Sequence, residues 1–92
     1  MALVITGHHI EVTEAIRENI TKHFDKLNDR FPCISQKLSF KKEGHEFKVT
    51  AEYKTDSKGI HVAQATNENL YQAVGDVVDK LTRMLRESKE KR

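Results

Sequence analysis

The sequence predicts an α+β fold: a two-layer sandwich in which a four-stranded mixed sheet carries two helices packed on one face. Two stretches repeat apolar residues at helical spacing, and three consecutive runs alternate apolar with polar residues. Each alternating run is apolar on one side only, so both helices should cover that side of the sheet. The predicted order is β-α-β-β-β-α, and the 92 residues are expected to form a single domain, 1–92.

Residues 2–7, "ALVITG", form a short β-branched run that ends in glycine and predicts the first strand. Thr13 is a good N-cap for the helix that follows, and Glu14 and Glu18 suit its positive end. Pro32 ends this helix. Its apolar residues share one face: Ile16, Ile20, Phe24, Leu27 and Phe31. The strands on either side of the helix can form a right-handed parallel crossover.

The remaining strands are expected to form an antiparallel meander with one face open to water. The strands are expected at residues 34–43, 47–55 and 60–65, and the turns between them at residues 43–46 and 56–59. The first of these strands should turn Ile34, Leu38 and Phe40 toward the helices. The next should turn four apolar residues the same way: Phe47, Val49, Ala51 and Tyr53.

The last helix has a clear apolar stripe, and Asn67 is placed to cap its start. The stripe is formed by Leu70, Val74, Val77, Val78, Leu81 and Leu85, with Tyr71 and Met84 at its margins. Gly75 lies inside the helix, where glycine costs about 1 kcal/mol relative to alanine. We expect this glycine to allow a close approach to the sheet.

Composition excludes several classes of protein. Only 37% of the residues are hydrophobic, and no run is long and apolar enough for a membrane span or a signal peptide. Cys33 is the only cysteine, which fits a reducing cytoplasm. His8 and His9 lack the spacing of metal ligands, and no nucleophile, base and oxyanion site can be assembled. We therefore expect no enzyme activity, cofactor, metal or membrane partner.

The positive charge of the chain is concentrated at its end. Residues 1–78 hold ten basic and eleven acidic side chains, whereas residues 79–92 hold six and three. On the first helix, Lys22, Lys26 and Arg30 form a ridge at steps of four residues. On the last helix a second ridge follows at steps of three residues: Lys80, Arg83, Arg86 and Lys89.

Two interpretations of these ridges remain open. Cations are favoured at helix C-termini, and the last helix offers four i, i+4 ion pairs. On this first interpretation the charged side chains only form a water-exposed helix face. Those pairs are Asp76–Lys80, Asp79–Arg83, Arg83–Glu87 and Arg86–Glu90. Two basic ridges on helices that share one sheet face instead predict a surface for RNA.

Known RNA-binding modules fit only in part. The β-β-β-α portion is similar to double-stranded RNA-binding domains, but those place lysines at the start of the final helix. Here that helix starts with "NENLYQ", which is acidic and neutral. No RNP-like aromatic strand and no G-x-x-G loop are present. A site for one RNA shape therefore fits better than general duplex binding.

The chain resembles the ribosome hibernation promoting factor family in its short form. The related ribosome-associated inhibitor A (protein Y) also matches, and the group is known too as sigma-54 modulation proteins. The resemblance runs from about Leu3 to Lys89 and is carried by "ITGHHIEVTEAIRENI", "KHFDKL" and "ENLYQAVGDVVDKLTRML". It implies the fold predicted above and binding to the small ribosomal subunit, in the channel between head and body. There the factor overlaps the mRNA and the A- and P-site tRNAs and silences translation under stress or in stationary phase.

The resemblance also implies which residues meet ribosomal RNA. By position, the family's basic contacts correspond to Arg17, Lys26, Lys80, Arg83 and Lys89. Lys22, Arg30 and Arg86 extend the two ridges with a looser match. His23 stands where relatives often carry lysine, which weakens that contact at neutral pH or makes it depend on pH.

Protein Y has an acidic C-terminal extension and long forms have a second domain, whereas this chain stops at "KEKR". We therefore expect a short form, monomeric when free, that favours ribosome dimers together with ribosome modulation factor. Two other functions remain as alternatives. One is a protein-interaction modulator of sigma-54 transcription, and the other is a general structured-RNA-binding domain.

Overall fold

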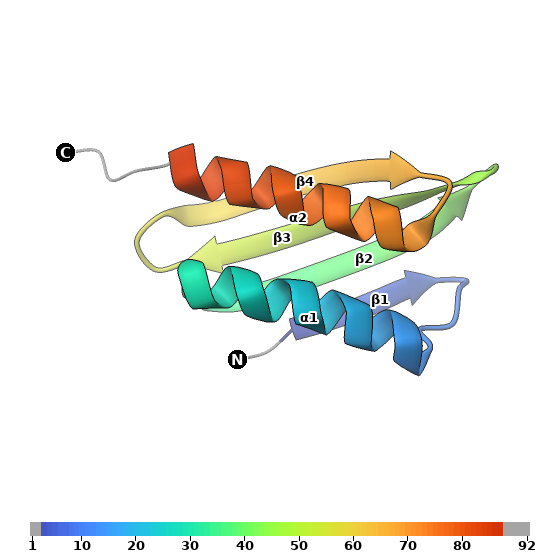
Figure 1. Cartoon of the computed structure of the whole chain (residues 1–92), viewed down its shortest axis with the longest axis horizontal. Helices are drawn as coiled ribbons and strands as arrows, with labels where there is room; N and C mark the ends of the chain where they lie inside the picture. Colours follow the sequence, from blue (N-terminus) through green and yellow to red (C-terminus); the bar gives the residue numbers. More distant parts are fainter. Residues whose placement is uncertain (1–2, 88–92) are drawn as a thin grey trace.

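Two helices and four strands follow one another in the predicted order, β-α-β-β-β-α (Figure 1). The structure is a computed structural model, and it describes residues 3–87. Its elements are β1 (Leu3–His8), α1 (Glu14–Arg30), β2 (Ser35–Glu43), β3 (Glu46–Thr55), β4 (Gly59–Asn67) and α2 (Leu70–Glu87). The α+β class and the mixed four-stranded sheet are thereby confirmed.

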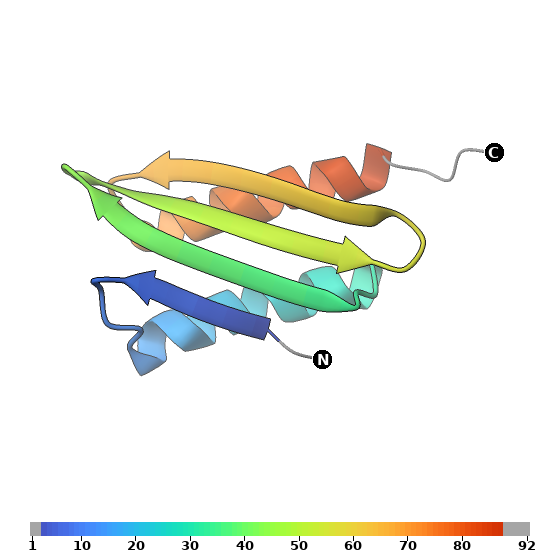
Figure 2. The ribbon, with the colours of Figure 1, turned by 180° about the vertical axis from the view of Figure 1, so that it is seen from behind.

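The strands are ordered β1-β2-β3-β4 across the sheet. β1 runs parallel to β2, as the predicted crossover requires, and the other two pairings are antiparallel. Both helices lie on one face (Figure 1), and the view from behind shows the other face of the sheet without a helix (Figure 2). The molecule is therefore a two-layer plate, with principal-axis extents of 44 × 23 × 17 Å.

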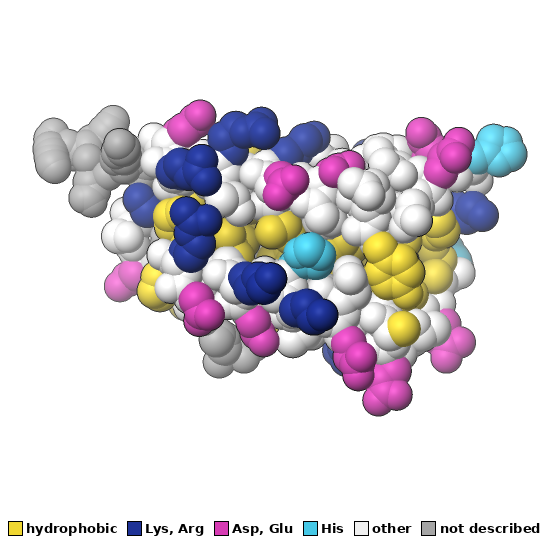
Figure 3. Space-filling view, in the orientation of Figure 1, with side chains coloured by type: hydrophobic (Ala, Val, Ile, Leu, Met, Phe, Trp, Pro, Cys, Tyr) yellow, Lys and Arg dark blue, Asp and Glu magenta, His cyan; other side chains and the backbone are white. Residues whose placement is uncertain are grey.

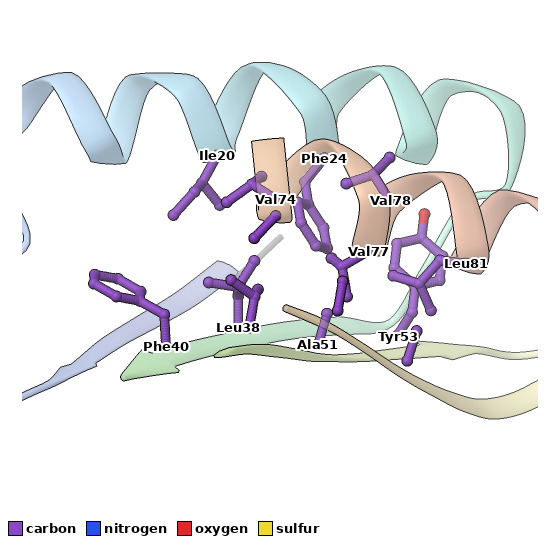
Figure 4. Packing of buried hydrophobic residues seen from close by; sticks show 14 of the residues in the cluster. Ile20, Phe24, Leu38, Phe40, Ala51, Tyr53, Val74, Val77, Val78 and Leu81 are labelled. Carbon is purple, nitrogen blue, oxygen red and sulfur yellow. The ribbon is translucent and has the colours of Figure 1, made fainter. Parts of the chain in front are cut away.

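The hydrophobic core fills the space between the helices and the covered face of the sheet. Figure 4 shows side chains from α1, such as Ile20 and Phe24, pointing into the same layer as Val74 and Val77 from α2. From the sheet, Leu38 and other inward residues of β2 and β3 complete this layer. The predicted helical stripes and the inward residues of β3 are confirmed, with two exceptions. Phe47 is only partly buried, and so is Phe31, which follows the last residue of α1.

The prediction that Ile34 faces the core is wrong. Its side chain is 53% exposed, because it lies in the connection between α1 and β2 rather than within the strand. The first inward position of β2 is instead taken by the polar residue Gln36. This side chain is buried, and its Nε2 donates to the Phe24 carbonyl at 3.4 Å. A hydrogen bond to a backbone carbonyl group of α1 thus makes a buried amide acceptable where an apolar residue was expected.

The predicted cap of the last helix is also wrong. Asn67 is the final residue of β4 and pairs with Phe47, so it cannot begin α2. The cap is Asn69, whose Oδ1 accepts from the backbone N–H groups of Tyr71 at 2.9 Å and Gln72 at 3.3 Å. At the other helix the predicted cap is confirmed, because Thr13 Oγ1 accepts from the N–H of Ile16.

Close packing against a glycine occurs in β1, not in α2. A Cβ atom added to Gly75 would meet nothing within 4 Å, so the expected close approach there is absent. A Cβ atom added to Gly7 would lie 2.3 Å from the Ile10 carbonyl oxygen and 3.1 Å from the ring of Phe40. Gly7 therefore lets the chain leaving β1 fold back tightly toward α1.

Candidate nucleic-acid interface

The two helices bring their C-terminal ends to the same end of the sheet (Figure 1). Each C-terminus carries a partial negative charge from its unpaired carbonyl groups, which favours cations nearby. In the space-filling view of the helical face, Lys and Arg side chains gather over this half of the molecule (Figure 3). Carboxylates border the basic cluster on that face, and the two predicted ridges therefore meet over one half of it.

The predicted RNA-binding residues within residues 3–87 are all exposed: Arg17, Lys22, Lys26, Arg30, Lys80, Arg83 and Arg86. Lys89, the eighth, lies outside the described residues. No ion pair joins any of the seven to a carboxylate within the described part of the chain. Three of the expected i, i+4 pairs are thus absent, and the fourth, Arg86–Glu90, reaches beyond residue 87. The cationic groups remain available to an anion.

Five of these residues form what we call the helical basic surface: Lys22, Lys26, Arg30, Arg83 and Arg86. On α2, Lys80 marks the side next to β4, because its Nζ donates to the Gln64 carbonyl oxygen at 2.7 Å. Each step of three residues turns the row back by about 60°. Arg83 therefore lies on the solvent side of α2, and Arg86 is turned further toward α1.

Two predicted residues lie apart from this surface. Arg17 is about 140° round α1 from Lys22, and it is near the start of the helix. Lys80 and Arg83 line a hollow of about 270 Å³ that Asp76 and Asp79 also line. Two carboxylates make that hollow a poor site for a phosphate, although the guanidinium of Arg83 can still reach outward. We therefore expect Arg17 and Lys80 to contribute less than the other five residues.

Segregation of charge, not net charge, makes the helical face basic. α1 contains four basic and four acidic residues, and α2 contains three of each, so each helix is formally neutral. In α1, wound at about 100° per residue, the four carboxylates gather on one side of the helix, and Lys22, Lys26 and Arg30 gather on the adjacent side. The basic side can therefore face phosphates while the acidic side is turned away from them.

An aromatic side chain beside this surface was not predicted as a functional residue. Tyr71 is 44% exposed and lines a hollow of about 300 Å³ between the two helices, together with Asn19 and Lys22. Exposed aromatic rings offer a surface on which unpaired RNA bases stack. The signal in the sequence was its place at the margin of the apolar stripe, but only the packing of α2 beside α1 shows that the ring remains open.

The described residues form neither a membrane-spanning helix nor a metal-binding cluster. No helix within residues 3–87 is long and apolar enough to cross a membrane. In the same range, no three His, Cys, Asp or Glu side chains come together as a metal site would need.

Relatives of the chain are recognised along its whole length. A family model described as "Sigma 54 modulation protein / S30EA ribosomal protein" matches residues 3–92. The ribosome hibernation promoting factor of Salmonella typhimurium is 38% identical over 94 residues, covering 99% of this chain and 96% of that protein. The factor of the same name from Pseudomonas putida is 33% identical, and the match covers 99% of this chain and 89% of that protein.

Solved structures share the fold at lower identity. A ribosomal subunit interface protein from Coxiella burnetii superposes with a TM-score of 0.82 at 22% identity, covering 95% of this chain and 96% of that one. The N-terminal domain of Thermus thermophilus Protein Y gives 0.83 at 20% identity, covering 92% and 94%. With the family model matching almost the whole sequence, the chain belongs to the sigma 54 modulation protein / S30EA ribosomal protein family.

Proposed function

We propose that this chain is a ribosome-associated hibernation factor that silences translation and catalyses no reaction. It binds the small ribosomal subunit in the decoding channel, through ribosomal RNA, and blocks the mRNA and tRNA sites. Under stress or in stationary phase it favours inactive ribosome dimers, together with ribosome modulation factor, and its place of action is the cytoplasm. The helical basic surface carries this proposal, in a chain whose relatives are named as ribosome hibernation promoting factors.

The basic residues have separate roles in holding RNA. Arg83 and Arg86 present planar guanidinium groups, which can donate two parallel hydrogen bonds to one phosphate. Lys22 and Lys26 act as mobile point charges on the neighbouring helix. Arg30 lies with its Cζ 5.6 Å from the centre of the Phe31 ring, a cation–π contact that limits where its guanidinium can move.

Inhibition in this mechanism is steric. The protein is a thin plate with a hydrophobic core, so it occupies a channel as one rigid body. Phosphate contacts then hold the plate in place without a chemical step. mRNA and tRNA cannot bind while the space that they need is filled.

A protein-interaction function is favoured by one observation on the opposite face. Val4, Ile60 and Val62 are about half-exposed on the side of the sheet that no helix covers. Val4 and Val62 also line a hollow of about 210 Å³. The strand patterns had placed apolar residues on the covered side of the sheet only, so this patch strengthens the alternative of a sigma-54 partner. Such binding would depend on the open face and would leave the helical basic surface unused.

Charge reversal at the end of α2 separates the two functions. The double variant Arg83→Glu, Arg86→Glu is expected to lose co-sedimentation with small ribosomal subunits, because two phosphate contacts become repulsions. The measurement is the fraction of protein that pellets with purified subunits through a sucrose cushion.

The matched control is Lys37→Glu with Lys54→Glu, which makes the same change in net charge on the open face of the sheet. Thermal unfolding of both variants establishes that each one still folds. We expect the control to pellet nearly as wild type does. Undiminished binding of the α2 variant would refute the assignment of the helical basic surface, and loss of binding in both would indicate attraction by net charge alone.

A further inference from the structure

The face of the sheet that no helix covers (Figure 2) is where the strand register places a row of basic side chains across three strands. His8 of β1 pairs in register with Lys41 of β2, and Lys41 pairs with Lys48 of β3. Directly opposite residues of a sheet lie on the same side, with Cβ atoms about 4.5–5.5 Å apart in antiparallel pairs. Three nitrogen-bearing side chains therefore stand in line on the outer face.

This row is unfavourable for the isolated protein. Like charges directly opposite one another destabilise a sheet, and Lys41 and Lys48 are such a pair. Lys41 is compensated by Glu43, with 3.2 Å between Nζ and Oε2, but the pair is about half-exposed and therefore weak. Lys48 is half-buried, and no carboxylate pairs with it in the part of the chain that the structure describes. A bound anion would remove this unfavourable charge.

A hollow of about 190 Å³ lies against the row. Besides the three basic residues, Ser39 and Thr50 line it, and these two are cross-strand partners. The carboxylates of Glu43 and Glu46 belong to the next row toward the hairpin, and they do not line the hollow. The hollow thus combines ammonium, imidazole and hydroxyl donors, which are groups that phosphate oxygens accept from.

We propose that this outer-face site, formed by His8, Ser39, Lys41, Lys48 and Thr50, binds a phosphate of an RNA backbone. Together with the helical basic surface, it lets the protein hold RNA on both broad faces of a plate that is 17 Å along its shortest axis. The inference rests on the proposed function, because a channel walled by RNA is where two-sided binding can occur. The site gives the open face of the sheet its own contact with RNA, which the helices on the other face cannot make.

Charge complementarity favours an RNA backbone over a free phosphate ion as the occupant. The outer-face site and the helical basic surface lie on opposite faces. Among the described residues, no carboxylate pairs with Lys48 or with the five cations of the helical basic surface, and Lys41 has only its weak pair with Glu43. A polymer of phosphates that surrounds the plate neutralises both surfaces at once, whereas a single ion neutralises one of them. The free energies of binding at the two faces should therefore add within one complex.

Lys48→Gln tests the site through the salt dependence of binding to purified small ribosomal subunits. For each phosphate contact that is lost, the slope of log K against log salt concentration should fall in magnitude by about 0.7–0.9. The matched control is Lys54→Gln, on the same strand and face with the same change of charge. Lys54 pairs with Ser35 and Ile60 and does not line the hollow. We expect the slope to fall for Lys48→Gln and to stay at the wild-type value for Lys54→Gln.

Identical slopes for wild type and Lys48→Gln would overturn the inference, and so would an equal decrease in both variants. Failure of the wild-type protein to bind subunits would instead overturn the proposed function. The site is then still tested by NMR, with a ten-nucleotide single-stranded RNA or inorganic phosphate added to labelled protein. Shifts of the Ser39, Lys48 and Thr50 amides with RNA would support it. Shifts with inorganic phosphate alone, or none, would overturn it.

Discussion

A single buried phenol, that of Tyr53, links the packing of this protein to pH. Its side chain has no exposed surface, and its hydroxyl donates to the Phe31 carbonyl at 2.5 Å, which ties β3 to the end of α1. Burial, and to a smaller extent the neighbouring Cys33 thiol, raises the pKa of Tyr53 far above its usual value of 10.0. The folded protein therefore favours the protonated phenol more strongly than the unfolded chain does.

The free energy of unfolding should accordingly decrease as pH rises above about 10, where tyrosine in the unfolded chain begins to lose its proton. Below that pH the contribution of Tyr53 is fully present. Tyr53→Phe should remove this part of the alkaline decrease, and it should cost about 0.5–1.5 kcal/mol at neutral pH for the lost hydrogen bond. Urea unfolding at pH values from 7 to 11 measures both effects.

The comparison for this experiment is Tyr71→Phe, which changes the exposed tyrosine. Because lysines also titrate in this pH range, only the difference between each variant and wild type is informative. Tyr71→Phe should retain the wild-type pH dependence. A Tyr53→Phe variant with the same alkaline decrease as wild type would show that the buried phenol is not its source.

The capping residue of one helix could be predicted from sequence, and that of the other could not. Thr13 was correctly predicted as a cap, because it directly precedes a long and regular apolar pattern. The cap at Asn69 was not predicted, because sequence alone does not show where β4 ends. The ladder with β3 extends β4 as far as Asn67, and this pairing between distant residues decided the boundary.

At the scale of the elements, the start of α2 depends on one side chain. Asn69→Ala removes the acceptor for two backbone N–H groups, so it should lower the free energy of unfolding by about 0.5–2 kcal/mol. Asn67→Ala is the natural comparison, because within residues 3–87 the Oδ1 of Asn67 accepts from one backbone N–H group, that of Asn69. Chemical denaturation should show the larger loss for Asn69→Ala. The reverse order would restore Asn67 as the residue that fixes the start of the helix.

The helices and strands themselves could be predicted because their periodicities are regular. Spacings of three and four residues in α1 and α2, and alternation in β3, follow from one-sided burial and need no knowledge of neighbours. The basic ridges were found in the same way, since Lys22, Lys26 and Arg30 belong to one helix. The row of His8, Lys41 and Lys48 was not found, because strand register joins residues that are far apart in sequence.

At the scale of the whole molecule, binding to small subunits should weaken steeply as salt concentration rises. Five phosphate contacts, one for each residue of the helical basic surface, would give a slope of about −3.5 to −4.5. Affinity should then fall by about two to three orders of magnitude between 50 and 200 mM salt. Equilibrium binding of labelled protein at several salt concentrations measures this slope. A nearly flat dependence would favour the protein-interaction alternative, in which apolar contacts on the open face dominate.

The one-sided core also has a consequence for how the family can diverge. Every second position of the strands faces away from the core, so substitutions there change the surface without repacking the interior. Chains of this fold can differ widely in sequence while their backbones stay superimposable, as the TM-score of 0.82 at 22% identity illustrates. Selection can therefore adjust what the open face contacts in each lineage independently of the residues that keep the chain folded.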